Sequence, residues 1–392
     1  MHKLRLLFIL LLPVLLTAQS YKKLHQRSIV IDTHNDFPNQ SMEKGVRFDQ
    51  DLKGITHSDL KRMKEGGIDV QVFSIWSDGT FTAGKGFARA NRQIDSLYAW
   101  TNRNPSAMMI TKTPADLKKA VRQKKLAVMM GVEGGHMIED KIEYLDQLYE
   151  RGVRYMTLTW NNSTSWASSA MDESANKIPN GKKGLTSLGE QIIQRMNALG
   201  MIVDISHVGE QTFWDAIRIS TKPVIASHSC VHQLCPVFRN LKDDQIKAIA
   251  KNGGVIHLNF FSGFVDSNFN KRNISFLNTH QREKDSLKAI NPEPHFTEEY
   301  LFSKYPEEVK ALRPPLSMLL DHLDYIVRLA GVDHVGLVSD VDGISSAPQQ
   351  LDDVTGLPLI TKALQERGYS KKDIRKILGE NFLRVFKANS SK

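Results

Sequence analysis

The chain has 392 residues, of which 41% are hydrophobic and 24% charged, and it carries a formal charge of +9. This composition is that of an ordinary globular protein and excludes a disordered chain, a collagen and a coiled coil. Two cysteines exclude a disulfide framework and a cysteine-rich zinc module. Basic residues are interleaved with acidic ones rather than clustered with aromatic ones, so we predict no nucleic-acid partner. The 13 histidines remain to be explained.

The first twenty residues have the pattern of a secretory signal peptide. Lys3 and Arg5 give a basic start, Leu6–Leu16 is an apolar run of eleven residues, and small residues follow up to Ser20. A membrane anchor is the alternative, but eleven residues fall short of the about 20 that a span needs. We therefore expect export to the periplasm or the cell exterior, with 21–392 as a single domain and no stable membrane span after cleavage.

After export, Cys230 and Cys235 would lie in an oxidising compartment. A bridge between cysteines only five residues apart strains disulfide geometry. We expect two unpaired thiols.

Short runs rich in β-branched residues alternate with longer amphipathic segments along the rest of the chain. Apolar residues at helical spacing mark segments such as 141–151, 188–199, 243–251 and 316–329. Strands that alternate with helices predict an α/β fold, a (β/α)8 barrel of the TIM type. An open doubly wound sheet is the alternative, but no glycine-rich dinucleotide loop follows the first run. The eight predicted strands are Ser28–Thr33, Ile68–Ile75, Leu126–Val132, Arg154–Thr159, Met201–Ile205, Pro223–Ser227, Gly254–Asn259 and His334–Ser339.

Two segments interrupt the alternation. Residues 81–125 form a two-part connection that contains a helical pattern over Arg89–Trp100. Residues 264–313 form a long polar insertion before the last strand. Insertions of this length in a barrel usually form lids or subunit contacts, so a homodimer is one expectation.

Side chains that bind metals follow the ends of several predicted strands. In a barrel, these ends share one rim, where catalytic groups collect. Imidazoles and carboxylates without thiolates suit a hydrolytic Zn²⁺ site with open positions. The residues at these ends are His34, Asp36, Glu133, His207, His228 and Asp340.

Each of these residues also has a purely structural interpretation. His34 and Asp36 would lie on one side of a strand by alternation, although such a pair alone is common. Glu133 could cap a helix, but Gly134 and the next glycine allow a metal to approach, and its two oxygens could bridge two metals. Single histidines at strand ends are more often hydrogen-bonded core residues than ligands, and only their number favours binding.

Two further residues are candidates for catalysis or for binding a substrate. Asp340 could form a turn with Gly343, but its place at the rim favours a general acid/base or a further metal ligand. Arg239, eleven residues after His228, could bind a carboxylate with two hydrogen bonds, and the alternative is an ordinary surface arginine.

Six ordered motifs resemble those of the membrane dipeptidase (renal dipeptidase) family of zinc peptidases. The resemblance runs from about Ser28 to Lys387, nearly the whole mature chain. A His-x-Asp pair alone is unspecific, whereas the ordered set is highly specific. The motifs are Ile31–Pro38, Gly131–His136, Asp204–Val208, Pro223–Ser229, Ser339–Gly343 and Gly379–Phe386.

The resemblance implies a barrel of the amidohydrolase type with two Zn²⁺ ions and Glu133 bridging them. The other ligands by the same carry-over are His34 and Asp36 for one ion, and His207 and His228 for the other.

The resemblance also implies the reaction. Dipeptides, including some with a C-terminal D-residue, would be hydrolysed by a hydroxide that bridges the metals. Asp340 matches the residue that handles the proton of that water, and Arg239 matches the arginine that binds the substrate's carboxylate.

One position departs from the family pattern. The family usually has a histidine at the end of the fourth strand that contacts the substrate, and here Trp160 occupies it. An indole N–H donates a hydrogen bond but does not titrate, which puts the substrate range and rate in question, and Asn161 or Asn162 are candidates to compensate. The rival predictions are an amidohydrolase for N-acyl amino acids, lactams or lactones, and an exported binding protein without turnover.

Overall fold

The computed structural model describes residues 21–79, 84–291 and 294–390. The predicted signal peptide at 1–20 lies outside these ranges, as does the start of the 81–125 connection. Within them, no helix is both long and apolar enough to cross a bilayer.

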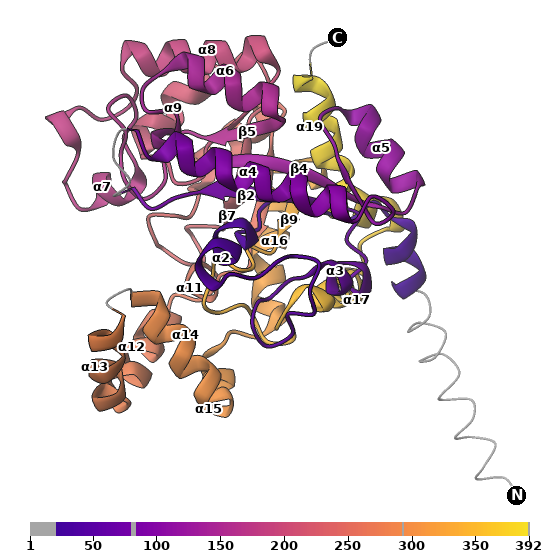
Figure 1. Cartoon of the computed structure of the whole chain (residues 1–392), viewed down its shortest axis with the longest axis vertical. Helices are drawn as coiled ribbons and strands as arrows, with labels where there is room; N and C mark the ends of the chain where they lie inside the picture. The colour runs from indigo at the N-terminus through magenta and orange to yellow at the C-terminus, as the bar shows by residue number, and fades with distance from the viewer. Residues whose placement is uncertain (1–20, 80–83, 292–293, 391–392) are drawn as a thin grey trace, which may run out of the picture.

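The strands form one parallel sheet that nearly closes into a barrel (Figure 1). The order along the sheet is β1-β2-β4-β5-β6-β7-β8-β9. A parallel bridge between Asn35 and Val341 brings the first strand beside the last one. These strands coincide with the eight predicted runs, which confirms the TIM-type barrel. They are β1 (Ile31–Asp32), β2 (Val70–Trp76), β4 (Leu126–Glu133), β5 (Val153–Thr157), β6 (Ile202–Asp204), β7 (Ile225–Ser229), β8 (Val255–Asn259) and β9 (Val335–Val338).

One strand was not predicted. β3 (Met108–Ile110) lies inside the 81–125 connection and pairs with β4 alone, beside the main path of the sheet. Three residues are too short to show the alternation by which a strand is recognised in a sequence. The predicted helix in the same connection is confirmed and extends over α4 (Gly86–Arg103).

Helices cover the outside of the barrel (Figure 1). The four segments predicted from helical spacing are confirmed as α6, α8, α10 and α16. Outside the insertion, the helices besides α4 include α2 (Phe37–Lys44), α3 (Leu60–Glu65), α5 (Pro114–Arg122), α6 (Ile142–Arg151), α7 (Ala170–Ser174), α8 (Ser187–Leu199), α9 (Glu210–Ile219), α10 (Asp243–Asn252), α11 (Ser262–Val265), α16 (Leu316–Ala330), α17 (Leu357–Glu366), α18 (Lys371–Arg375) and α19 (Asn381–Asn389).

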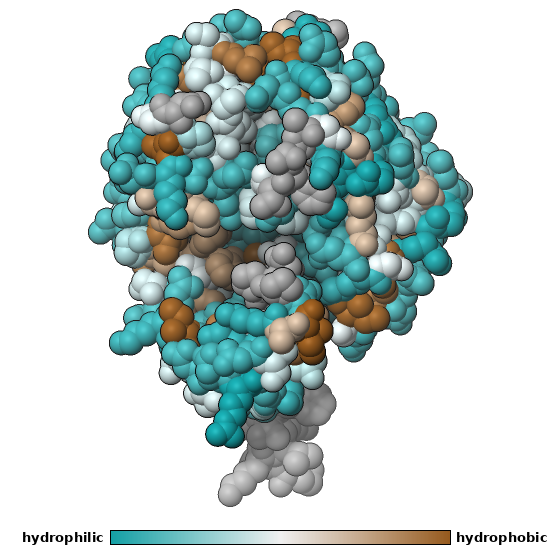
Figure 2. All heavy atoms as spheres, turned by 60° about the vertical axis from the view of Figure 1, so that its left-hand side comes forward, coloured by the Kyte–Doolittle hydropathy of each residue, from teal (hydrophilic) through white to brown (hydrophobic). Residues whose placement is uncertain are grey.

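The polar insertion folds into helices that the sequence analysis did not predict. They pack around a small apolar cluster that includes Phe269, Phe276 and Leu301. Figure 1 places them together to one side of the barrel, and Figure 2 shows a mostly hydrophilic face with apolar residues in separate patches. The helices are α12 (Phe269–Thr279), α13 (Gln281–Ile290), α14 (Pro294–Lys304) and α15 (Pro306–Leu312).

Alternation along the strands decides which side chains face the barrel interior. On β4, Ala127 and Met129 belong to an apolar cluster formed by the starts of the strands. Phe382 and Phe386 of α19 belong to the same cluster, so this end of the interior is filled with apolar side chains. The inward parity of β4 continues through Gly131 to Glu133. The carboxylate of Glu133 therefore lies at the opposite, polar end of the barrel interior.

Candidate metal centre

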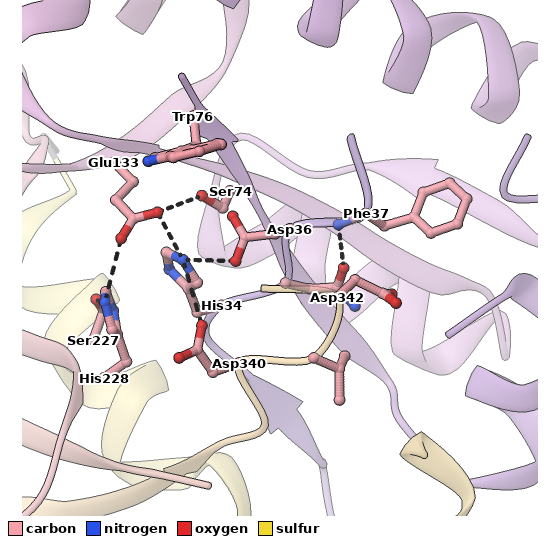
Figure 3. A network of polar contacts seen from close by, with 12 residues as sticks. His34, Asp36, Phe37, Ser74, Trp76, Glu133, Ser227, His228, Asp340 and Asp342 are labelled. Atoms are coloured by element: carbon pink, nitrogen blue, oxygen red, sulfur yellow. Dashed lines mark hydrogen bonds and ion pairs between the residues drawn. The ribbon is translucent and has the colours of Figure 1, made fainter. Parts of the chain in front are cut away.

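His34 and Asp36 lie together at the carboxyl end of β1 (Figure 3). The Nε2 atom of His34 is 3.5 Å from Oδ2 of Asp36, and both residues are buried. The assigned strand β1 ends at Asp32, but a parallel bridge between Asn35 and Val341 continues the pairing between the two residues, so their proximity is consistent with the predicted alternation. Asp36 immediately precedes α2.

Glu133, the last residue of β4, lies between two groups of histidines. Its Oε2 atom is 3.2 Å from Nε2 of His34. Its Oε1 atom is 2.9 Å from Nε2 of His207 and 3.4 Å from Nε2 of His228. Each oxygen of one carboxylate thus faces a different group, as a bridging ligand requires.

The rings of His207 and His228 face one another through their Nε2 atoms. Their Nε2 atoms are only 2.8 Å apart. Burial lowers the pKa of His207 to about 4, and burial together with neighbouring His34 lowers that of His228 well below its usual value. Both rings are therefore neutral at pH 7, and each carries one N–H.

In both histidine rings the hydrogen is on Nδ1, the nitrogen that faces away from the other ring. Nδ1 of His207 is 3.0 Å from the amide oxygen of Asn161, which can only accept. Nδ1 of His228 is 2.7 Å from the Ser227 hydroxyl, whose own hydrogen is donated to Asp204 at 2.6 Å. Two lone pairs consequently point at each other across 2.8 Å, an arrangement that a bound cation stabilises.

The charges at the centre also favour a cation. Burial lowers the pKa of His34, but the nearby Tyr155 hydroxyl and the Glu133 and Asp36 carboxylates raise it well above its usual value. Burial raises the pKa of Glu133, but the neighbouring histidines outweigh this and hold it well below its usual value. Oδ1 of Asp36 is buried without a hydrogen-bond partner among the described residues. Buried carboxylates that stabilise positive charge on His34, together with an unpaired carboxylate oxygen, fit metal binding, and imidazole with carboxylate suits Zn²⁺.

Asp340 lies beside this cluster. Its Oδ1 atom is 3.9 Å from Nε2 of His34, and its Oδ2 atom accepts a hydrogen bond of 2.8 Å from Asn259. Burial raises its pKa to about 7. The ligand-type atoms of His34, Asp36 and Asp340 all lie within 4.8 Å of one another. Asp340 is therefore placed either to bind a metal or to exchange a proton with a water held there.

Arg239 is buried at the edge of the same centre, not on the surface. Its guanidinium donates to the His228 carbonyl at 3.3 Å and lies 5.3 Å from the Phe264 ring, while its Nε atom is buried without a partner among the described residues. Arg239 and His207 both line a cavity of about 240 Å³. A cationic group with unused donors at a cavity next to the metal centre is suited to bind an anionic group.

Trp160 lies beside His207, with 6.4 Å between the centroids of the two rings. It packs edge-on against Trp76 at 5.1 Å, and Trp76 is the last residue of β2. Figure 3 shows the Trp76 indole beside Glu133, and its Nε1 atom is buried without a partner among the described residues. The two indoles form an aromatic wall next to the bridging carboxylate.

Several residues in contact with the centre were missed from the sequence. Ser74 donates to Glu133 at 3.3 Å, and Asn259 holds Asp340. Both occupy strand positions, as does Tyr155, so inward parity along the predicted strands could have identified them, whereas Trp76 lies one residue beyond the predicted end of its strand. Asn161, considered for a contact with substrate, instead uses its oxygen on His207.

His257 and the two cysteines remain to be placed in the structure. His257 is buried, hydrogen-bonded to the Ala226 carbonyl and packed on Phe382, as a core residue. Cys230 and Cys235 are free and buried within the described structure.

The sequence matches the profile of the membrane dipeptidase family, peptidase family M19, over residues 18–392. An uncharacterized dipeptidase of Schizosaccharomyces pombe is 30% identical over 389 residues, covering 95% of this chain and 83% of that protein. The structure of the probable dipeptidase PvdM from Pseudomonas aeruginosa has a TM-score of 0.78 and 25% identity, covering 95% of this chain and 98% of its own. A metallo peptidase from Rhodobacter sphaeroides, solved with a phosphinate mimic of the dipeptide L-Ala-D-Ala, shares the fold. It has a TM-score of 0.74 and 24% identity, covering 92% of this chain and 99% of its own.

Proposed function

The chain belongs to the membrane dipeptidase family, peptidase family M19, and is a peptide-bond hydrolase of the metallo-dipeptidase type; from this premise we propose that it hydrolyses dipeptides with two Zn²⁺ ions. The observation that carries the proposal is the position of Glu133. One of its oxygens faces His34, and the other faces the neutral histidine pair formed by His207 and His228.

The ligand-type side chains divide into two sets that share Glu133. His34 and Asp36 would hold one ion, and His207 and His228 would hold the other. When bound, such a pair supplies an activated water and polarises the scissile carbonyl.

The chain's own residues account for the remaining needs of the reaction. Arg239 would hold the substrate's free carboxylate and so fix the peptide bond in place. Hydrolysis forms a bond from the water oxygen to the carbonyl carbon and breaks the C–N bond. Asp340 would take a proton from the attacking water and deliver it to the leaving amine, which departs neutral. Trp160 would border the substrate.

A small cavity adjoins the proposed metal centre, and of the proposed metal ligands only His207 lines it. The cavity beside Arg239 has a volume of about 240 Å³. An anchor on the carboxylate fixes the C-terminal residue without reading its configuration, so we include dipeptides with a C-terminal D-residue. The fold relative solved with a mimic of L-Ala-D-Ala motivates that dipeptide as a test substrate.

The test combines metal analysis with a substrate panel. The purified chain is stripped of metal, reloaded with Zn²⁺ and assayed on L-Ala-L-Ala, L-Ala-D-Ala, N-acyl amino acids, a lactam and a lactone. We expect two metal equivalents and turnover of dipeptides only. Turnover of the other substrates alone would identify another amidohydrolase, and two metals with no turnover at all would identify a binding protein.

Glu133→Gln tests the bridge directly. We expect it to lose activity and about one metal equivalent, because a neutral amide has lost one anionic oxygen. Glu143→Gln on an exposed position of α6 is the matched control and should behave as wild type. Full activity with two metals in Glu133→Gln would contradict the bridge.

Two further proposals concern the chain as a whole. We propose that residues 1–20 direct export and are removed, which N-terminal sequencing of the secreted or periplasmic protein tests. We also propose a homodimer, for which light scattering of the purified chain gives the mass.

A further inference from the structure

Tyr155 on β5 reaches across the barrel interior to β1. It is 1% exposed, and its ring lies among the apolar side chains that fill the interior. Its hydroxyl is 2.9 Å from Nδ1 of His34. Two other strands, β2 and β4, separate β5 from β1 in the sheet, so this contact is not one between neighbours.

Gly131 on β4 leaves the space that the Tyr155 ring occupies. The two residues are partners in the register of β4 and β5. A Cβ atom at position 131 would lie 2.1 to 2.4 Å from the ring atoms, which is far too close for any side chain. The absence of a side chain at this inward position thus lets the tyrosine cross to His34.

The hydrogen bonds of the Tyr155 hydroxyl run in one direction. It donates its single hydrogen to the Thr33 carbonyl at 3.0 Å, and a carbonyl can only accept. Towards His34 the hydroxyl oxygen must therefore accept, so Nδ1 of His34 carries the hydrogen. The remaining ring nitrogen, Nε2, lies beside Glu133 and Asp36, so its lone pair would be available to a cation that these carboxylates also bind.

The histidine pair on the opposite side of Glu133 depends on different residues. Ser227 and Asp204 fix the ring of His228, and they belong to β7 and β6. No hydrogen bond described in the structure joins Tyr155 to this second set. The outer ring nitrogens of the two halves are therefore held by different side chains, while Thr33 joins the two through its backbone contact with Tyr155 and its hydroxyl, which donates to the Ser227 carbonyl at 3.1 Å.

We propose that Tyr155 is a positioning residue for the half of the centre formed by His34 and Asp36, and that its hydroxyl sets the metal affinity of that half alone. Ser227 has the corresponding role for the half formed by His207 and His228. This inference rests on the proposed two-metal function. Loss of an outer hydrogen-bond partner of a metal-binding histidine typically lowers metal affinity by about 10-fold to 100-fold.

The experiment is a Zn²⁺ titration of the metal-free full chain against a chelator of known affinity. Tyr155→Phe keeps the ring that fills the barrel and removes only the hydroxyl. We expect one equivalent bound as in wild type and the other about 10-fold to 100-fold more weakly. Tyr98→Phe, which removes a hydroxyl that donates to the Arg151 carbonyl far from the centre, is the control and should bind both as wild type.

Double variants show which half is affected. Asp36→Asn should weaken the same equivalent as Tyr155→Phe, so that the chain with both changes still binds one ion tightly. Tyr155→Phe combined with Ser227→Ala should bind neither ion tightly. Unchanged affinity in Tyr155→Phe, or equal weakening of both equivalents, would overturn the inference. A wild-type chain that binds fewer than two ions would instead overturn the proposed function.

A second measurement does not depend on any variant. Nitrogen-15 NMR of the Zn²⁺-loaded wild-type chain reports which ring nitrogen of each histidine carries the hydrogen. We expect a protonated Nδ1 at His34. A hydrogen on Nε2 of His34 in the loaded chain would contradict the assignment.

Discussion

Arg239→Met is expected to reduce the cleavage of dipeptides while leaving the metals in place. Arg239 is 5% exposed, its guanidinium donates to the His228 carbonyl at 3.3 Å, and its Nε atom is buried without a partner among the described residues. Burial lowers its pKa to about 10, so it remains charged at neutral pH. Its unused donors therefore remain for the carboxylate of the substrate.

The size of the effect follows from this burial. Truncating one partner of a buried, hydrogen-bonded charge pair costs about 2–5 kcal/mol. Because the guanidinium is nearly inaccessible to water, we expect a value near the middle, about 3–4 kcal/mol, or a loss of about 100-fold to 1,000-fold in kcat/KM. Methionine keeps an apolar contact with Phe264 and removes a buried charge, so the fold should not be weakened by a similar amount.

The assay compares a dipeptide with the same dipeptide bearing a C-terminal amide. The amide lacks the carboxylate, so the large loss in kcat/KM should be confined to the free dipeptide. Arg195→Met, at a half-exposed arginine paired with Asp146, is the control for the loss of a charge. An equal loss on both substrates, or a loss of bound metal, would refute the assignment of Arg239 to the carboxylate.

Three further predictions concern single residues. Asp340→Asn should lower kcat by about 10²-fold to 10⁴-fold with two metals retained, and loss of a metal equivalent would make it a ligand instead. Trp160→Phe keeps the packing on Trp76 and removes the indole N–H, so kcat on dipeptides should fall by up to about tenfold, whereas an unchanged kcat would exclude this donor. Burial raises the pKa of the Asp69 carboxyl from 3.8 to about 6. The unfolded chain therefore loses this proton more readily than the folded chain as the pH rises from about 4 to 6. The free energy of unfolding should fall by up to about 3 kcal/mol over this range. Asp69→Asn should remove this loss and stabilise the chain at pH 7 but not at pH 4 in urea unfolding, and equal stability at pH 7 would contradict it.

Much of the fold could be predicted because its signals are local. Each barrel strand is a buried run that ends in polar residues, and each predicted helix repeats its apolar positions at helical spacing. The three-residue strand β3 and the helices of the insertion lacked such signals. The sequence of the insertion is mostly polar because its helices are small and bury only a few apolar residues, such as Phe269 and Leu301.

The candidate site was predictable to a similar extent. Residues that follow strand ends were recognised, because parallel strands in a barrel bring their carboxyl ends to one rim. For His34 and Asp36, the bridge of Asn35 with Val341 continues the extended pairing beyond the end of β1, which is consistent with the predicted alternation. Nothing in the spacing of Arg239 showed that it is buried at the centre.

Hydrophobic alternation and the residue types at strand ends are properties of the chain, so the chemical groups at the rim of the barrel can be identified without a structure. How those groups face one another depends on the tertiary fold. The contact of Tyr155 with His34 across the space left by Gly131 joins three strands, and the direction of its hydrogen bonds depends on the Thr33 carbonyl. Such contacts depend on register and on barrel closure, and these arise only when distant segments pack together.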